Sequence, residues 1–428
     1  MTSRALSVLE TGKRDLYYSD SSNGLTQAIP VEYNTRFTYE MSNKNSGVSV
    51  FLLPPGNAYR TPVLVLGYSS ASLAGNTGGY ALPRGWGYNA IKSLSVRVAG
   101  STQMFWSGSQ LLQRNTRLVR TASQADQILA LGGNICVNAT DFAQDQFSYI
   151  PISWWSGVSV DGLSLPLPAD ILSQSVQITV EINPPSAFWI ANTNPGGLVG
   201  ALPSGFTTGY LQTEQLVMAD RAMSLANEPS FAGGEVSYSM PVYGGFDQQE
   251  QVISNLNAST DSQSVVLTGF RAGECKSIEL YLVDKRSTNI NKNYWRLPKA
   301  VSLLYTGVIY SQFNDGTSQI FNLIDGTKPS AFNTFTLTQP VAPGVMTVGT
   351  TPVLSQWVSL PFGQRTGEDF EANVISHGKE ILNGVCNLQI SLPTADAMPG
   401  GGSVYELHAV YVYNSALNFA RGTCEWIF

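Results

Sequence analysis

Apolar and polar residues alternate with a period of two in many short segments of this chain. In the clearest segment, Val176–Ile182, every second residue is aliphatic and would lie on one face of a strand. The fully apolar run at residues 63–66 suits a strand that is covered on both faces. The same alternation predicts further strands at residues 35–41, 48–51, 91–98, 210–218, 235–242, 264–268, 278–283 and 405–413. The pattern is typical of an all-β protein.

Residues 149–185 predict an elbow between two strands. The aromatic-rich segment 149–155 leads through a Gly/Ser turn to a piece that contains Pro166 and Pro168. Proline cannot donate a hydrogen bond to a ladder, so this piece is predicted to be a bend or a sheet edge. We expect Trp154 and Trp155 to pack in a core or between subunits, with stacking on a sugar as the alternative.

Helical signals are confined to one long loop, residues 107–146. Residues 123–126 have the pattern of a capping box, and Gly132-Gly133 is a helix stop. One short helix is therefore expected inside this loop. A loop of this length is usually functional or lies at an interface.

The second half of the chain repeats the first. Three markers occur in the same order at a nearly constant offset, which indicates a duplicated domain, although β patterns also align by chance. The paired segments are Val63, Val65 and Leu66 with Leu280, Leu282 and Val283; residues 95–99 with 302–306; and Ile178, Val180 and Ile182 with Leu388, Ile390 and Leu392. The predicted units are an arm at 1–30, a first sandwich at 31–228, a linker at 229–234 and a second sandwich at 235–428.

The composition favours buried or interfacial surface over a charged binding surface. Charged residues make up 13% of the 428 residues, which is about half the usual share, and aromatic residues make up 11%. The balance of 24 basic and 30 acidic residues gives a net charge of −6. It argues against sequence-specific nucleic-acid binding.

The cysteines and the apolar runs suggest a soluble chain from a reducing compartment. Four cysteines are too scattered for a disulfide framework or a zinc site, so they are expected to be reduced and partly buried thiols. No secretory signal is expected at the N-terminus, and no apolar run approaches the roughly 18 residues of a membrane span. The glycosylation sequons at Asn138 and Asn257 are interpreted as chance.

The candidates for catalysis do not form a site. His377 lies in a polar loop, and His408 lies in a strand on the face opposite Leu407, where an exposed or interface role is favoured over that of a base. Residues 67–72 resemble a nucleophile elbow only superficially. That motif requires a helix directly after the turn, and no helix is expected there. Adjacent Glu368 and Asp369 would point to opposite faces of a strand, whereas a glycosidase needs its two carboxyls close together.

The remaining acidic residues fit turns better than a metal site. Asp315-Gly316 and Asp325-Gly326 are turn signals, and a calcium loop would need more oxygen ligands at fixed spacing. We therefore predict no catalytic, cofactor-binding or metal-ligating residue and no cofactor, and we expect that the chain is not an enzyme.

The ordered set of motifs resembles the double jelly-roll major capsid proteins of tailless icosahedral dsDNA viruses, of the large nucleocytoplasmic, virophage and polinton-like lineages. Segments 150–155, 163–167 and 176–182 match the signature at the end of that family's first jelly roll. In the second half, the matching segments are 293–310, 359–363, 367–375, 386–392 and 405–422. Glu371-Ala372 departs from the family's Phe-Ser. The resemblance covers residues 30–428, and its motifs are weak singly and specific as a set.

This resemblance implies a fold, a function and partners. The fold would be all-β, with two consecutive eight-stranded jelly-roll sandwiches and short helices in loops. The protein would be a structural major capsid protein of the virion, assembled inside the host cell as a pseudo-hexagonal homotrimer. Its partners would be neighbouring capsomers and minor capsid or penton proteins. The loops 101–148 and 311–356 would build an outer crown and clasps within the trimer.

Three alternatives stay open at this stage. The arm at 1–30 would lie under the shell, against neighbours, minor proteins or an internal membrane, or it would be a disordered terminus. A β-sandwich carbohydrate-binding or adhesin protein is the main competing function. A minor jelly-roll capsid or spike protein is the second competitor.

Overall fold

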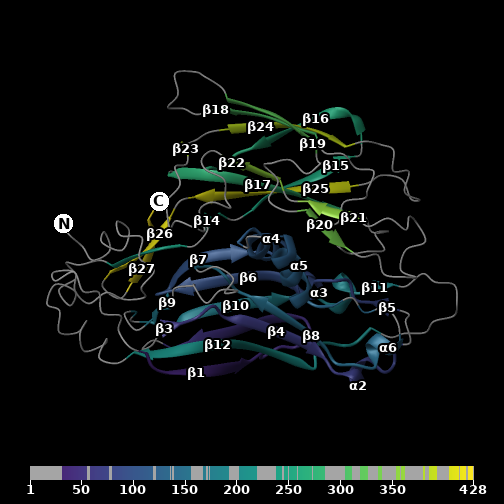
Figure 1. Cartoon of the computed structure of the whole chain (residues 1–428), viewed down its shortest axis with the longest axis vertical. Helices are drawn as coiled ribbons and strands as arrows, with labels where there is room; N and C mark the ends of the chain where they lie inside the picture. Colours follow the sequence, from purple (N-terminus) through teal and green to yellow (C-terminus); the bar gives the residue numbers. More distant parts are fainter. Residues whose placement is uncertain are drawn as a thin grey trace.

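The computed structural model shows two β-sandwiches joined in one chain (Figure 1). Among the described residues, no helix is long and apolar enough to cross a membrane. The arm at 1–30 and the linker at 229–234 lie outside the described residues. The structure describes residues 31–54, 58–76, 80–118, 122–134, 136, 139–155, 167–169, 172, 174–191, 202–218, 238–242, 245–248, 250–257, 259–271, 273–284, 304–310, 319–325, 336–339, 353–356, 358–361, 379–380, 385–392, 404–413, 415–420 and 423–427.

The first sandwich consists of a six-stranded sheet and a four-stranded sheet, both antiparallel. The six-stranded sheet has the order β8-β4-β12-β3-β9, with β1 paired along β12, and the four-stranded sheet has the order β2-β10-β6-β7. The strands are β1 (Val31–Glu40), β2 (Gly47–Leu53), β3 (Ala58–Tyr59), β4 (Val63–Tyr68), β6 (Ile91–Val98), β7 (Ser101–Trp106), β8 (Gln146–Pro151), β9 (Leu167–Pro168), β10 (Val176–Ile182) and β12 (Thr208–Met218).

The second sandwich repeats this strand order. Its six-stranded sheet is β14-β25-β17-β22, with β15 on β25 and β23 on β17, and its four-stranded sheet is β16-β24-β18-β19. The strands are β14 (Phe246–Asp247), β15 (Gln251–Asn257), β16 (Ser259–Leu267), β17 (Glu274–Asp284), β18 (Leu304–Tyr310), β19 (Gln319–Asp325), β22 (Val358–Pro361), β23 (Lys379–Glu380), β24 (Val385–Leu392) and β25 (Val404–Tyr413).

The equivalence of strands confirms the predicted duplication. The order β1-β12-β4-β8 corresponds to β15-β25-β17-β22, and β2-β10-β6-β7 corresponds to β16-β24-β18-β19. The first and third paired markers fall in equivalent strands, and the described part of the second, residues 304–306, falls in β18, the equivalent of β6. The first alignment, which sets Val63 over Leu280, is nevertheless out of phase by one residue. In β4 the core cluster contains Leu64 and Leu66 but not Val65, whereas in β17 it contains Leu280. A uniformly apolar strand such as β4 shows no alternation, so its sequence could not fix which residues face the core.

Alternation sets the core wherever it is present. In β10 the burial pattern is strictly alternating, and Ile178 and Val180 are fully buried. They pack in one layer with Phe51 of β2 and with Leu94 and Val96 of β6. Buried apolar side chains of both sandwiches form one continuous cluster. The two sandwiches therefore share a core and are not merely tethered.

Three small sheets and several short helices complete the described chain. The sheets are β5 (Tyr80–Ala81) with β11 (Ile190–Ala191), β13 (Tyr238–Pro241) with β26 (Ala416–Ala420) and β27 (Thr423–Ile427), and β20 (Thr336–Gln339) with β21 (Val353–Gln356). The helices are α2 (Ser70–Leu73), α3 (Trp86–Ala90), α4 (Gly108–Arg117), α5 (Ala122–Leu131), α6 (Ala139–Phe142) and α7 (Pro185–Phe188).

Two helix expectations are corrected. The segment 107–146 holds three helices where one was expected, because Ser107 caps α4 by accepting a hydrogen bond from the Gln110 N–H (3.1 Å). A one-turn helix, α2, does follow the Gly67 segment, since Ser69 caps it in the same way. The segment 101–148 also contains β7, and α4 and α5 lie between the two sandwiches (Figure 1). This part of the predicted outer crown is therefore internal.

The elbow brings both of its tryptophans into the core, as predicted. Trp154 and Trp155 are 0% and 2% exposed, and their rings meet edge to face with centroids 5.0 Å apart. The proline-containing strand β9 lies at the end of its sheet, which confirms the predicted edge.

We expect the substitution Trp155→Ala to lower the free energy of unfolding by about 3–5 kcal/mol, because it leaves a large cavity in a packed core. Denaturant titration followed by circular dichroism measures the loss. Phe105→Ala, at a ring that is 45% exposed, is the matched control and should change it little. Equal effects of the two variants would contradict a core role for Trp155.

Candidate functional site

Helix α4 is buried between the two sandwiches although it is rich in polar residues. It begins immediately after β7, and Gly108 at its start allows a close approach, because a Cβ there would lie 1.9 Å from the Tyr88 carbonyl oxygen. Five polar side chains on the helix are at most 1% exposed: Gln110, Gln113, Arg114, Asn115 and Thr116. A helix with buried polar residues on so many positions must be covered on more than one side.

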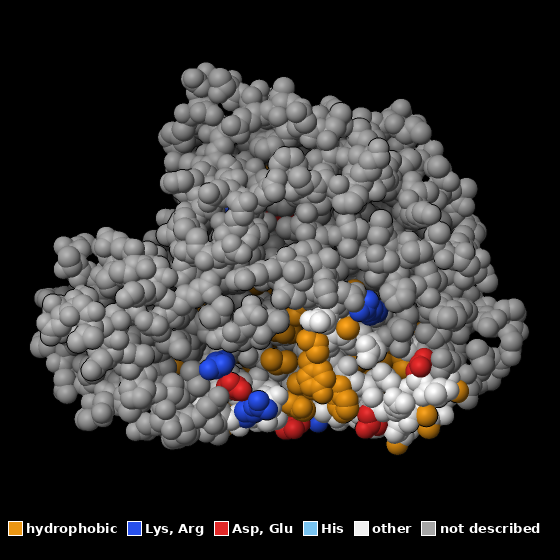
Figure 2. Space-filling model, in the orientation of Figure 1, with side chains coloured by type: hydrophobic (Ala, Val, Ile, Leu, Met, Phe, Trp, Pro, Cys, Tyr) orange, Lys and Arg blue, Asp and Glu red, His pale blue; other side chains and the backbone are white. Residues whose placement is uncertain are grey.

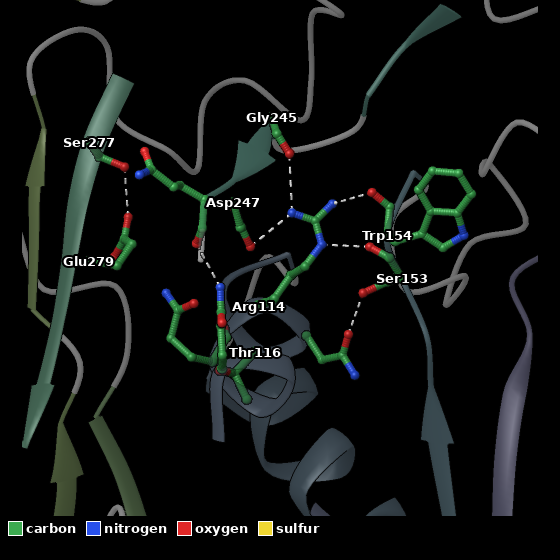
Figure 3. A network of polar contacts seen from close by, with 12 residues as sticks. Arg114, Thr116, Ser153, Trp154, Gly245, Asp247, Ser277 and Glu279 are labelled. Carbon is green, nitrogen blue, oxygen red and sulfur yellow. Dashed lines mark hydrogen bonds and ion pairs between the residues drawn. The ribbon is translucent and has the colours of Figure 1, made fainter. Parts of the chain in front are cut away.

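Arg114 of α4 forms an ion pair with Asp247 of β14 in the second sandwich (Figure 3). The Nη1 and Oδ2 atoms are 3.0 Å apart, and both side chains are fully buried. The guanidinium carbon also lies 5.5 Å from the centre of the Trp106 ring. The two sandwiches are thus joined by a charge pair that is shielded from water.

Backbone carbonyls satisfy the rest of the guanidinium. Nε donates to the Ser153 carbonyl (2.5 Å), Nη2 to the Trp154 carbonyl (3.4 Å) and Nη1 to the Gly245 carbonyl (3.2 Å). Gly245 has a φ of +80°, and a Cβ there would meet the Tyr413 carbonyl oxygen at 2.4 Å. The planar guanidinium of Arg114 therefore donates hydrogen bonds to the elbow of the first sandwich and to a glycine turn of the second at the same time.

Neighbouring residues extend this network on the first sandwich. The Asn115 amide donates to the Pro151 carbonyl (2.9 Å) and to the Tyr88 hydroxyl (3.0 Å), and the Ser153 hydroxyl donates to the Asn115 side-chain oxygen. The Gln110 amide crosses to the Gln248 carbonyl of the second sandwich (2.9 Å). Such a connected network specifies one relative orientation of the elements that it joins.

The C-terminal hairpin makes a second connection between the sandwiches. The Gln103 amide of β7 donates to the Cys424 carbonyl (3.0 Å), and the Trp426 indole N–H donates to the Gln103 carbonyl (3.2 Å). The Trp426 ring packs on Phe246, with centroids 4.6 Å apart. Phe246 precedes Asp247, so the hairpin and the ion pair act on the same short strand.

His408 lies between two carboxylates on the second sandwich. Its Nδ1 is 3.1 Å from Glu250, its Nε2 is 3.4 Å from Glu406, and the residue is 6% exposed. Burial lowers the pKa of His408, but the hydrogen bonds to Glu250 and Glu406 outweigh it, so the pKa is raised overall. Glu279 faces the same side from β17, where its neighbour across the sheet is Val410. The charged imidazolium is therefore the form that this pocket favours.

The other predicted chemical residues form no centre in the described part of the chain. No group of three or more His, Cys, Asp or Glu side chains that could hold a metal is found there. Cys136, Cys275 and Cys424 are buried and form no disulfide, and burial together with Asp141 raises the pKa of Cys136 to about 12. His377, Glu368, Asp369 and the side chains of Asp315, Asp325 and Cys386 lie outside the described side chains.

Comparison with known proteins gives a likeness in structure and none in sequence. No family model and no curated protein matches the chain. The PBCV-1 virus capsid aligns over 95% of this chain and 100% of its own, with a TM-score of 0.59 and 10% identity. The Faustovirus major capsid protein aligns over 99% and 97% (TM-score 0.54, 9% identity), and the mavirus major capsid protein over 96% and 93% (TM-score 0.51, 11% identity). The chain has the double jelly-roll fold, as the sequence motifs implied.

A double-mutant cycle tests the ion pair. Arg114→Met and Asp247→Leu should each lower the free energy of unfolding by about 3–5 kcal/mol, because each leaves an uncompensated buried charge. The double variant should lose much less than the sum of the two, since it leaves no charge behind.

The exposed pair Lys92–Glu181, at 2.7 Å, is the matched control, and its cycle should give a coupling of about 0.2–1 kcal/mol. Equal coupling energies for the two pairs would refute the special role of the buried one.

The His408 pocket predicts a stability that depends on pH. Its raised pKa means that the stabilisation is complete below the pKa of an unfolded histidine, about 6.5, and is lost as the pH rises through the folded-state value. The free energy of unfolding of the wild type should therefore fall over this window, and that fall should be missing from His408→Gln. His377→Gln, at the second of the two histidines, is the control. A fall that persists in His408→Gln would assign it to other groups.

Proposed function

We propose that this chain is a structural major capsid protein that builds the shell of a tailless icosahedral DNA virus, and that it is not an enzyme. The observation that carries the proposal is the alignment of both sandwiches, in the same order, with viral capsid proteins over nearly the whole of each chain. Because a shared fold can serve several functions, the interface between the sandwiches supplies separate support. A subunit of a regular shell needs a fixed orientation of its two sandwiches. The buried ion pair between Arg114 and Asp247, with its carbonyl partners, favours one such orientation.

The assembly unit is a homotrimer with a pseudo-hexagonal outline. Two like-folded sandwiches in each of three chains give six similar units around a threefold axis, so that near-sixfold edges arise from a threefold oligomer. Its neighbours in the virion are other capsomers and minor capsid or penton proteins, and the arm at 1–30 reaches minor proteins or an internal membrane. The domain limits 31–228 and 235–428 belong to this proposal.

The competing carbohydrate-binding function loses its main support. Trp154 and Trp155, the paired rings that could stack on a sugar, are in the core. A minor capsid or spike protein of the same fold is distinguished by abundance, because a major capsid protein is the predominant protein of purified particles.

The purified chain should form a particle of about 140 kDa, three times the chain mass of 46.2 kDa. Light scattering coupled to size exclusion measures the mass, and negative-stain images should show one class of particles with a hexagonal outline. A stable monomer at micromolar concentration would argue strongly against the capsid proposal, and glycan binding by that monomer would favour the carbohydrate-binding alternative.

A further inference from the structure

A short segment of the first sandwich carries five buried polar atoms that have no hydrogen-bond partner in the described part of the chain. The segment runs along β7 and α4, and the residues concerned are at most 5% exposed. The atoms are Gln103 Oε1, Trp106 Nε1, Gln110 Oε1, and both Nε2 and Oε1 of Gln113. Buried polar groups in folded proteins nearly always have a partner, so a group of exceptions within residues 103–113 indicates a further ligand.

These atoms lie at the boundary between the two sandwiches. Gln103 and Gln110 each donate one side-chain hydrogen bond across this boundary, to backbone carbonyls 3.0 and 2.9 Å away. Gln113 lies one turn after Gln110 on the same side of α4. It is followed by Arg114, whose ion pair also crosses to the second sandwich.

On the side of α4 that faces the first sandwich, the polar groups are satisfied. The Asn115 amide donates to the Pro151 carbonyl and to the Tyr88 hydroxyl, and its oxygen accepts from Ser153. The Thr116 hydroxyl donates to carbonyls of its own helix. The unpartnered atoms therefore belong to the boundary and not to the helix as a whole.

Polar groups on the outside of the molecule can bind solvent directly. Figure 2 shows lysine, arginine, aspartate and glutamate side chains at the surface along the lower part of the molecule. The amide of Gln113 has no such access, because the residue is 1% exposed. A buried amide donor and a buried amide acceptor without partners would each favour the unfolded state by roughly tenfold or more.

The five atoms require a neutral ligand that both donates and accepts hydrogen bonds. Trp106 Nε1 and Gln113 Nε2 are donors, and the other three atoms are acceptors. A cation would leave the donors without a partner, and an anion would leave the acceptors without one. The charges beside them, on Arg114 and Asp247, already compensate each other. Water fits such a mixed set, since a buried water molecule typically makes about three hydrogen bonds.

We propose that the boundary between the two sandwiches holds enclosed water molecules, bound by these five polar atoms of β7 and α4. The waters extend the direct hydrogen bonds of Gln103 and Gln110 across the boundary. Arg114 does not need them, because Asp247 and backbone carbonyls accept from its guanidinium. This inference concerns the contact within one chain and is independent of the capsid proposal.

A high-resolution crystallographic or electron-microscopic map of the wild-type protein tests the inference directly. Water oxygens should lie about 2.7–3.2 Å from both amide atoms of Gln113 and from Gln110 Oε1. Protein groups or an ion at these positions would overturn the inference, and so would the absence of density there.

The variant Gln113→Met gives a second readout, because methionine has nearly the shape of glutamine but forms no comparable hydrogen bonds. If water binds the amide, the equilibrium constant for unfolding should rise about three- to tenfold in denaturant titration. An amide without any partner predicts the opposite sign, since its removal would relieve an unfavourable burial.

Gln127→Met, at an exposed position of α5, is the matched control and should leave the equilibrium constant unchanged. A fall in the constant for Gln113→Met relative to this control would overturn the inference. If Gln113→Met does not fold, the wild-type map decides.

Discussion

The two sandwiches meet around a buried cation, Arg114, which contacts both of them. Arg114 has no access to water, so its charge must be met by Asp247 and by three carbonyls from two separate parts of the chain. The desolvation of such a pair roughly offsets its attraction, so its contribution lies less in net stability than in geometry. Any rotation of one sandwich against the other would lengthen several charge-assisted hydrogen bonds at once. The C-terminal hairpin acts in the same place through Trp426 and Phe246.

The sandwiches are built from one plan, but their equivalent surfaces differ in chemistry. The six-stranded sheet of the second sandwich bears Asp247, Ser277 and Glu279 on its outer face, under the first sandwich. That of the first bears Phe147 and Tyr149 at its open edge. A duplicated fold can thus make a specific polar contact within the chain and present an apolar surface outside it.

The fold class could be predicted from the sequence, but the contact between the two sandwiches around α4 could not. Period-two alternation is local, so strands such as β10 and the repeated order of strands could be predicted from short windows. The proline-marked edge and the buried tryptophans followed from equally local rules. Helix α4 was not predicted, although Ser107 is a good N-cap. The alignment of β4 with β17 was out of phase because residues 63–66 are all apolar and show no alternation. The partner of Arg114 could not be found at all, since no local pattern links residues 131 positions apart, the separation of Arg114 from Gly245.

That separation has a consequence for synthesis on the ribosome. The first sandwich can close once β12 has emerged, because β1, β4 and β3 all pair with it. At that moment Arg114 already belongs to the emerged part of the chain, whereas β14 with Asp247 has not yet emerged. The nascent domain must therefore carry an unneutralised guanidinium on an uncovered helix until the next stretch of polypeptide arrives. The two sandwiches can therefore take up their final orientation only after β14 has emerged and Asp247 has met Arg114.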